Sequence, residues 1–345
     1  MWYNDYNAYC SVACQELHWT TTHRLICTEK PITIDVERLN PLLALLVEYC
    51  HLDPAKPLHP ALTRTIINSP NPSPSADVLP HGSGKARLVI LGDSIPTGVE
   101  RQTKLWWPSG VSNLARIFLD NQRYECRLPV NGLGGLKPPM RLKYKSFPIA
   151  DFGIAKGKIA AKDHHKLAYQ LDAQGTVLEE QDPDNHYWLY FTTTKEEQLL
   201  MDYGLLTFDH MAIVDTKAYQ HPALPSKNKA PAYFCDRTMA GASPPIHDFQ
   251  QRFSFFWDDG LRSLIAHCLE SLDEPVGAHA IWSLLDRLAR RQCSAAEKVL
   301  AVHWARLDRA ILETIFNDPT KPWEKWPPTP RIGVWGQSST RSPVE

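Results

Sequence analysis

The sequence predicts an α+β fold, in which a mixed β-sheet is followed by a C-terminal helical block. Two observations support this prediction. Short runs with the composition of strands, several of them alternating apolar and polar residues, occupy the middle of the chain. The last third instead places apolar residues at three- and four-residue steps, as amphipathic helices do. Strands followed by helices, rather than strands alternating with helices, favour the α+β class.

Six runs in the middle of the chain are candidate strands. They are 87–91, 141–147, 166–171, 186–194, 211–214 and 251–258. Between two of them lies "IADFGIAKGK" (149–158), which we interpret as a glycine-containing turn after a strand end at Phe147 and Pro148.

Three segments near the C-terminus are candidate helices, at 258–272, 277–292 and 294–316. The last of these opens with Ser294 and Glu297, which have the spacing of a capping box. A shorter helix is expected near the N-terminus, where Asn40 can cap it and Pro41 suits its first turn.

Composition shifts divide the chain into five parts. A Cys- and Trp-rich first unit (1–28) precedes a helical connector (29–66) and a Pro/Ser-rich linker (67–85). The α+β body is expected to cover 86–316, and a Pro/Trp-rich tail covers 317–345. The linker is too polar and too rich in proline to bury a core of its own.

The overall composition excludes several classes of protein. Of the 345 residues, 43% are hydrophobic and 22% are charged, which is typical of a globular chain. The net charge of −1 disfavours binding to nucleic acid or to an anionic membrane. No apolar run is long enough to span a bilayer, and the first residues show no secretory signal. The eight cysteines are therefore expected to be reduced, in the cytoplasm or the nucleus.

The strongest chemical signal lies near the N-terminus. Cys10, Cys14, His23 and Cys27 follow the pattern C-x3-C-x8-H-x3-C. In a helical backbone each pair four residues apart projects from one face, so each pair could hold one ion between its side chains. Thiolate and imidazole are the ligands that zinc prefers, and these four residues are the candidate metal ligands.

This segment resembles the second half of a MYND-type zinc finger. The residues in register are Tyr9, Cys10, Ser11, Cys14, Gln15, Trp19, His23 and Cys27, with one extra Thr before the histidine. The resemblance implies two zinc sites with interleaved ligands, Cys10 and Cys14 serving one and His23 and Cys27 the other. The two Cys-x-x-Cys pairs that complete these sites in the family would precede Tyr9, so each site keeps two of its four ligands.

Three explanations of this half-finger remain open. A misplaced start codon would mean that the natural chain carries the complete finger. Alternatively, the four residues collapse onto one zinc ion, with His18 nearby. In the third explanation the segment is a metal-free relic, whose Trp19 packs against the body. Zinc binding by this segment is accordingly expected to be intact, weak or lost.

The resemblance also implies a function. MYND fingers recognise partner proteins, chiefly through short proline-containing peptides, and the remainder of the chain resembles fungal-type proteins that carry such fingers. The expected function is therefore that of a zinc-binding protein–protein interaction adaptor, with no catalytic and no organic cofactor-binding residues. Trp19 and the exposed edge of the finger would contact the partner.

Three stretches resemble parts of enzymes. The Asp-Phe-Gly at 151–153 resembles the magnesium-binding turn of kinases, but no His-Arg-Asp precedes it. Gly-Asp-Ser at 92–94 resembles the nucleophile of GDSL esterases, but no base for Ser94 follows the family's spacing. "KEEQLLMDYG" (195–204) is similar to the closing segment of SET methyltransferases. A SET-like methyltransferase, or another enzyme seated in the body, is the alternative function.

Overall fold

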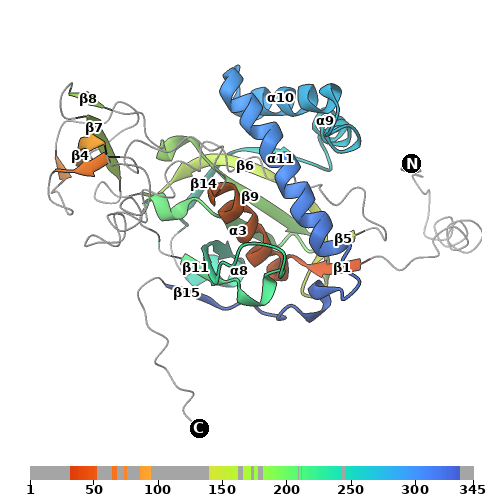
Figure 1. Cartoon of the computed structure of the whole chain (residues 1–345). Coiled ribbons are helices and arrows are strands. Elements are labelled where there is room, and N and C mark those ends of the chain that lie inside the picture. The colour runs from red at the N-terminus through yellow and green to blue at the C-terminus, as the bar shows by residue number, and fades with distance from the viewer. Residues whose placement is uncertain are drawn as a thin grey trace, which may run out of the picture.

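The structure is a computed structural model (Figure 1). It describes residues 32–52, 64–67, 74–75, 86–94, 140–161, 166–171, 175–177, 182–208, 210, 212–242 and 245–334. Strands dominate the first two thirds of this part and long helices follow them. The predicted α+β class, with its helical block near the C-terminus, is confirmed.

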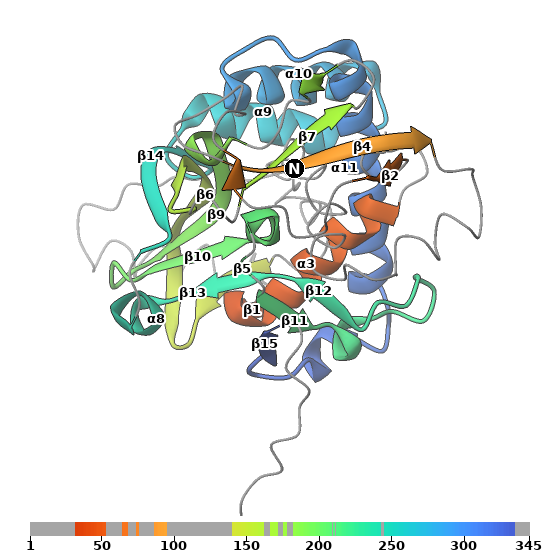
Figure 2. The ribbon, with the colours of Figure 1, turned by 90° about the vertical axis from the view of Figure 1, so that its left-hand side faces the viewer.

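The main sheet contains strands from four stretches of the chain. Its strands are β1 (Ile32–Asp35), β5 (Met140–Tyr144), β6 (Phe147–Ile159), β9 (His186–Thr193), β10 (Gln198–Asp202), β13 (Tyr233–Cys235) and β14 (His247–Ser254). Their order is β1-β5-β6-β9-β10-β13, and β14 pairs with the second half of β6. Only β1 and β5 run parallel, and the other pairs are antiparallel. Figure 2 shows β14, β6, β9, β10 and β13 side by side.

Two smaller sheets flank the main one. The first has the order β12-β11-β15 and consists of β11 (Ala212–Asp215), β12 (Lys229–Pro231) and β15 (Ile332–Val334). The second lies to one side of the molecule in Figure 1. It comprises β2 (Arg64–Ile66), β3 (Pro74–Ser75), β4 (Ala86–Ser94), β7 (Leu167–Leu171) and β8 (Thr176–Val177). Its strand β3 falls within the segment interpreted as a linker and pairs with β4.

The long helices gather on one side of the main sheet (Figure 1). They are α3 (Val36–Leu52), α9 (Asp259–Glu270), α10 (Pro275–Ala289) and α11 (Ala295–Phe316). Short helical turns complete the described chain: α8 (Arg237–Ala242), η4 (Pro183–Asn185), η5 (Leu205–Phe208), η6 (Lys217–Tyr219) and η7 (Pro322–Lys325). None of the helices in the described part of the chain combines the length and the apolar character that crossing a bilayer requires.

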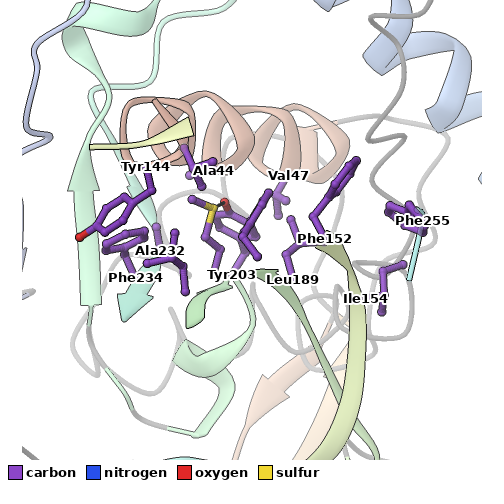
Figure 3. Close-up of a cluster of buried hydrophobic side chains, with 14 of the residues drawn as sticks. Ala44, Val47, Tyr144, Phe152, Ile154, Leu189, Tyr203, Ala232, Phe234 and Phe255 are labelled. Carbon is purple, nitrogen blue, oxygen red and sulfur yellow. Dashed lines mark hydrogen bonds between the residues drawn. The ribbon is translucent and has the colours of Figure 1, made fainter. Parts of the chain in front are cut away.

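Helix α3 packs directly on the main sheet (Figure 3). Its Ala44 and Val47 join a cluster that includes Phe152, Leu189 and Phe234 from three strands. The other side of α3 contacts α11 and η7, through a second cluster that includes Trp323 and Trp326. The segment interpreted as a helical connector thus contains a strand and a helix that belong to the core of the body.

The predicted turn at 149–158 is wrong, because β6 runs without interruption through it. Its glycines serve close contact between strands rather than a change of direction. A Cβ at Gly153 would lie 1.9 Å from the carbonyl oxygen of Phe253, and one at Gly157 would lie 1.9 Å from that of Asp248. Glycine is needed wherever a neighbouring backbone approaches this closely.

The predicted start of the first helix is also wrong, because α3 begins at Val36 and contains Pro41 in its interior. The side chain of Asp35 accepts a hydrogen bond of 3.0 Å from the backbone N–H of Glu37 and so caps the helix earlier. Asn40, which was expected to be the cap, is buried and bonds to another part of the chain.

Candidate functional site

Three ionisable side chains meet at one end of the main sheet. Nε2 of His186 and Nε2 of His247 each lie 2.7 Å from the same oxygen, Oδ2 of Asp202. Their ligand atoms all lie within 4.8 Å of one another, and the three residues are buried. Within the described part of the chain, this is the one group of three or more such side chains whose atoms converge in this way.

The sheet topology explains why residues so distant in sequence meet. His186 opens β9, Asp202 closes β10 and His247 opens β14, so all three lie where these antiparallel strands share one end. His186 stands opposite Gly157 and His247 opposite Ile159, which are two residues apart on β6. Residues two apart on a strand share a face, so both imidazoles project to the same side of the sheet.

A glycine on β6 makes room for the group. A Cβ at Gly157 would lie 2.9 Å from the ring of Trp188 as well as 1.9 Å from the carbonyl oxygen of Asp248. Trp188 follows His186 by two residues and lies on the same face of β9. The bare backbone of Gly157 therefore lets the indole and strand β14 approach β6 together.

Aromatic rings enclose the three side chains. The ring centroid of Trp188 lies 4.6 Å from that of His247, and Phe208 packs edge-on against His186 at 5.6 Å. Tyr233 lies 5.6 Å from His247 on the side of β13. The side chains of the three ionisable residues are accordingly 0% to 2% exposed.

The electrostatics of the group depend on the two imidazoles. Burial by itself would raise the pKa of Asp202. The charge of His186 and the hydrogen bonds from His186 and His247 outweigh burial and hold this pKa well below its usual range. The second carboxylate oxygen, Oδ1, accepts a hydrogen bond of 2.8 Å from the backbone N–H of Gly204. Asp202 is therefore an ionised carboxylate whose orientation is fixed from both sides.

One polar atom of the enclosing aromatic rings is unpaired within the described residues. Trp188 is 3% exposed, and its Nε1 has no hydrogen-bond partner within the part of the chain that the structure describes. A buried donor without an acceptor is destabilising, and such atoms commonly mark the place of a water molecule or ligand.

The group can do one of two things chemically. The two imidazoles can each donate an N–H to Asp202, which makes the group a buried hydrogen-bonded link between three strands. Alternatively, the same two nitrogens and one oxygen can coordinate a divalent metal ion, since imidazole and carboxylate are common zinc ligands. Acid–base chemistry on a substrate would require access from solvent, which the enclosing rings do not provide in this structure.

The metal ligands expected from the sequence, Cys10, Cys14, His23 and Cys27, lie outside the described residues. Sequence reasoning did not select His186, Asp202 or His247. They are separated by 16 and 45 residues. Each of the three residues is an ionisable residue at the end of a strand, and this feature could have indicated them. It predicts a cluster only when the order of the strands in the sheet is known, and the spacing of residues in the sequence does not reveal that order.

The stretches that resemble parts of enzymes lie in or around strands of the described part of the chain. Asp151, of the kinase-like motif, lies within β6 and accepts hydrogen bonds from the hydroxyls of Tyr190 (3.0 Å) and Ser254 (2.6 Å). Ser94, of the esterase-like motif, is the exposed last residue of β4. The SET-like stretch contains β10 and supplies Asp202 to the buried group.

Comparison of the chain with protein-family models, with curated proteins and with solved structures gives no match in any of the three.

Proposed function

We propose that this protein is a zinc-binding protein–protein interaction protein of the MYND-finger type and not an enzyme. The observation that carries the proposal is the spacing of Cys10, Cys14, His23 and Cys27, which combines the preferred ligands of zinc with the other residues of a finger. The partner is a protein that presents a proline-containing peptide. The proposed location is the cytoplasm or the nucleus.

The body supports a non-catalytic role. Its converging ionisable group, formed by His186, Asp202 and His247, is enclosed by aromatic rings. Catalytic metal and acid–base sites keep a position open to substrate, whereas structural sites are closed. The enclosure of this group favours a stabilising role within a scaffold.

The body also offers an exposed aromatic surface. Trp257 is 76% exposed and follows Phe256, which is 41% exposed. The backbone N–H groups of both residues donate to Oγ of Ser254, at 3.2 and 2.8 Å. The hydroxyl of Ser254 in turn donates to Asp151. A tryptophan on an anchored turn loses little entropy on binding, and tryptophan is enriched among residues that dominate binding energy.

Proline-containing peptides suit such a surface. Their polyproline II conformation is preformed, and they dock against exposed aromatic rings in several recognition domains. The second contact surface that we propose for the partner is therefore the turn at Phe256 and Trp257, with the N-terminal finger as the first.

The test is calorimetric titration of the zinc-loaded full chain with a proline-rich peptide and with a matched peptide in which alanine replaces proline. We expect saturable binding of the proline peptide alone. Replacing Cys10 and Cys14 by serine should abolish the binding. Trp257→Ala should weaken it by at least about tenfold, as loss of a dominant contact does.

Val299→Ala is the matched control, because Val299 is 66% exposed on α11 and does not belong to the proposed surface. It should bind like the unmodified chain. Equal binding of both peptides, or undiminished binding by the Cys10→Ser, Cys14→Ser chain, would rule out the proposed function.

A further inference from the structure

We infer that His186, Asp202 and His247 form a site for one divalent transition-metal ion, with zinc as the preferred occupant. This site lies in the body and uses none of the N-terminal cysteines. It therefore does not rest on the proposed function, and either proposal can fail while the other stands.

The ligand set is the first argument. Two imidazole nitrogens and one carboxylate oxygen suit zinc and other first-row divalent ions. Zinc holds such atoms at about 2.0 to 2.2 Å, which in a tetrahedron places the ligand atoms about 3.3 Å apart. Here each Nε2 lies 2.7 Å from Oδ2 of Asp202. The ligand atoms need to separate by about 0.6 Å to admit the ion.

The rigidity of the group is the second argument. The three side chains come from the ends of three strands of one sheet, not from loops. The backbone N–H of Gly204 donates a hydrogen bond to Oδ1 of Asp202, which leaves Oδ2 as the single coordinating oxygen. Hydrogen bonds of this kind orient the ligands of metal sites before the ion arrives.

Burial is the third argument. The side chains of His186 and Asp202 are 0% exposed, and that of His247 is 2% exposed. Bulk water therefore does not compete with an ion for the three ligand atoms, and a carboxylate in such a position needs charged or hydrogen-bonding partners. A divalent cation between the three side chains would be a partner of this kind.

A fourth ligand completes the site. An ion held by three protein atoms takes water as its fourth ligand, as in catalytic zinc sites, but here the enclosing rings separate that position from substrate. The indole N–H of Trp188 is a buried donor without a partner among the described residues, and its ring lies 4.6 Å from that of His247. A metal-bound water is an acceptor of the required kind.

The test measures metal per chain by mass spectrometry after expression in zinc-supplemented medium. The N-terminal variant carries Cys10→Ser, Cys14→Ser, His23→Ala and Cys27→Ser in the full chain. The body variant carries His186→Gln and His247→Gln. Glutamine keeps an N–H donor for Asp202 but ligates zinc poorly, so a hydrogen-bonded link would survive where a metal site would not.

We expect the N-terminal variant to retain about one zinc ion per chain and the body variant to lose about one relative to the unmodified chain. His221→Gln is the control. His221 pairs with Asp318 at 3.1 Å, and no third ligand joins them among the described residues, so its replacement should leave the metal content unchanged. A metal-free N-terminal variant, or a body variant with undiminished zinc, would overturn the inference.

Cobalt substitution gives a second readout that does not depend on the folding of the body variant. Cobalt at the N-terminal cysteines gives thiolate charge-transfer absorption, whereas cobalt bound by two nitrogens and an oxygen gives visible bands alone. We expect visible bands without thiolate absorption from the N-terminal variant. The absence of these bands would contradict the inference even if the body variant did not fold.

Discussion

The hydroxyl of Tyr203 donates a hydrogen bond of 3.0 Å to Oδ1 of Asn40, 163 residues earlier in the chain. Both residues are buried, at 5% and 1% exposed. Tyr203 directly follows Asp202, and Asn40 lies on α3. This bond therefore ties helix α3 to the end of β10, which carries Asp202, one of the three candidate metal ligands.

Loss of this bond should destabilise the protein. Tyr203→Phe leaves Oδ1 of Asn40 without this donor in a buried position, and we expect it to lower the free energy of unfolding by about 1–3 kcal/mol. Tyr219→Phe is the control, because its buried hydroxyl has no hydrogen-bond partner within the described residues. Urea unfolding should find the control neutral or slightly stabilised, and equal losses for the two variants would contradict this account.

A methyl group at Gly157 should distort the candidate site. Its Cβ would meet the backbone oxygen of Asp248 at 1.9 Å, and backbone atoms can move only by shifting the strand. We expect Gly157→Ala to destabilise the protein by about 3 kcal/mol or more, at the upper end of overpacking effects.

Gly241→Ala provides the comparison for Gly157→Ala. Gly241 is in α8, and no atom of the described residues lies within 4 Å of a Cβ placed there, so alanine should be neutral or stabilising by about 0.5–1 kcal/mol. Thermal unfolding of both variants measures the difference. A tolerated Gly157→Ala would mean that β6 and β14 are not packed as closely as the structure shows.

Asp308 should make the protein less stable as pH rises. Burial raises the pKa of this carboxyl to about 8, although the thiol of Cys50 donates to it at 3.6 Å and acts in the opposite direction. The folded protein therefore keeps a proton that the unfolded chain releases above its ordinary pKa. Between about pH 4 and pH 8, each pH unit lowers stability by at most about 1.4 kcal/mol from this group.

Asp308→Asn removes this titration. The stability of the unmodified protein relative to Asp308→Asn should fall from pH 5 to pH 8 and level off above. The stability of the unmodified protein relative to Asp286→Asn should not change between pH 5 and pH 8. The reason is that the N–H of Cys293 and the ammonium of Lys298 hold the pKa of Asp286 below its usual value. Urea unfolding at several pH values checks both, and a flat profile for the Asp308 comparison would refute the prediction.

The capping box of α11 should contribute measurable stability. Oγ of Ser294 accepts from the N–H of Glu297 at 3.3 Å, and the Glu297 carboxylate accepts from the N–H of Ser294 at 2.7 Å. We expect Ser294→Ala to lower the free energy of unfolding by about 1 kcal/mol. Thr314→Ala, at an exposed position near the other end of the helix, should change it by less than about 0.5 kcal/mol.

Local patterns predicted those elements whose signals lie within their own sequence. The capping box at Ser294 is confirmed, as are the helices that become α9, α10 and α11. The strand predicted at 186–194 is β9, and the one predicted at 87–91 lies within β4. In these segments periodicity, caps and burial all favour the same structure.

The predictions failed where contacts between distant parts of the chain determine the local structure. Gly153 and Gly157 suggested a turn, but they serve the close approach of β14 to β6. Pro41 suggested a helix start, but Asp35 caps α3 earlier. His186, Asp202 and His247 come together through strand pairing between distant segments, and no local pattern records such pairing. The N-terminal ligands lie outside the described residues, so that part of the sequence analysis stays a prediction.

The zinc K-edge X-ray absorption spectrum of the purified full chain tests the central claim most directly. We expect a shell of nitrogen and oxygen at about 2.0–2.2 Å with imidazole scattering, from the site in the body and from His23, and sulfur at about 2.3 Å, from the N-terminal cysteines. In the N-terminal variant, which lacks His23 and the three cysteines, the nitrogen and oxygen shell with imidazole scattering should remain without sulfur. An N-terminal variant without this shell would contradict the site in the body. A chain that contains no zinc after zinc-supplemented expression would contradict both.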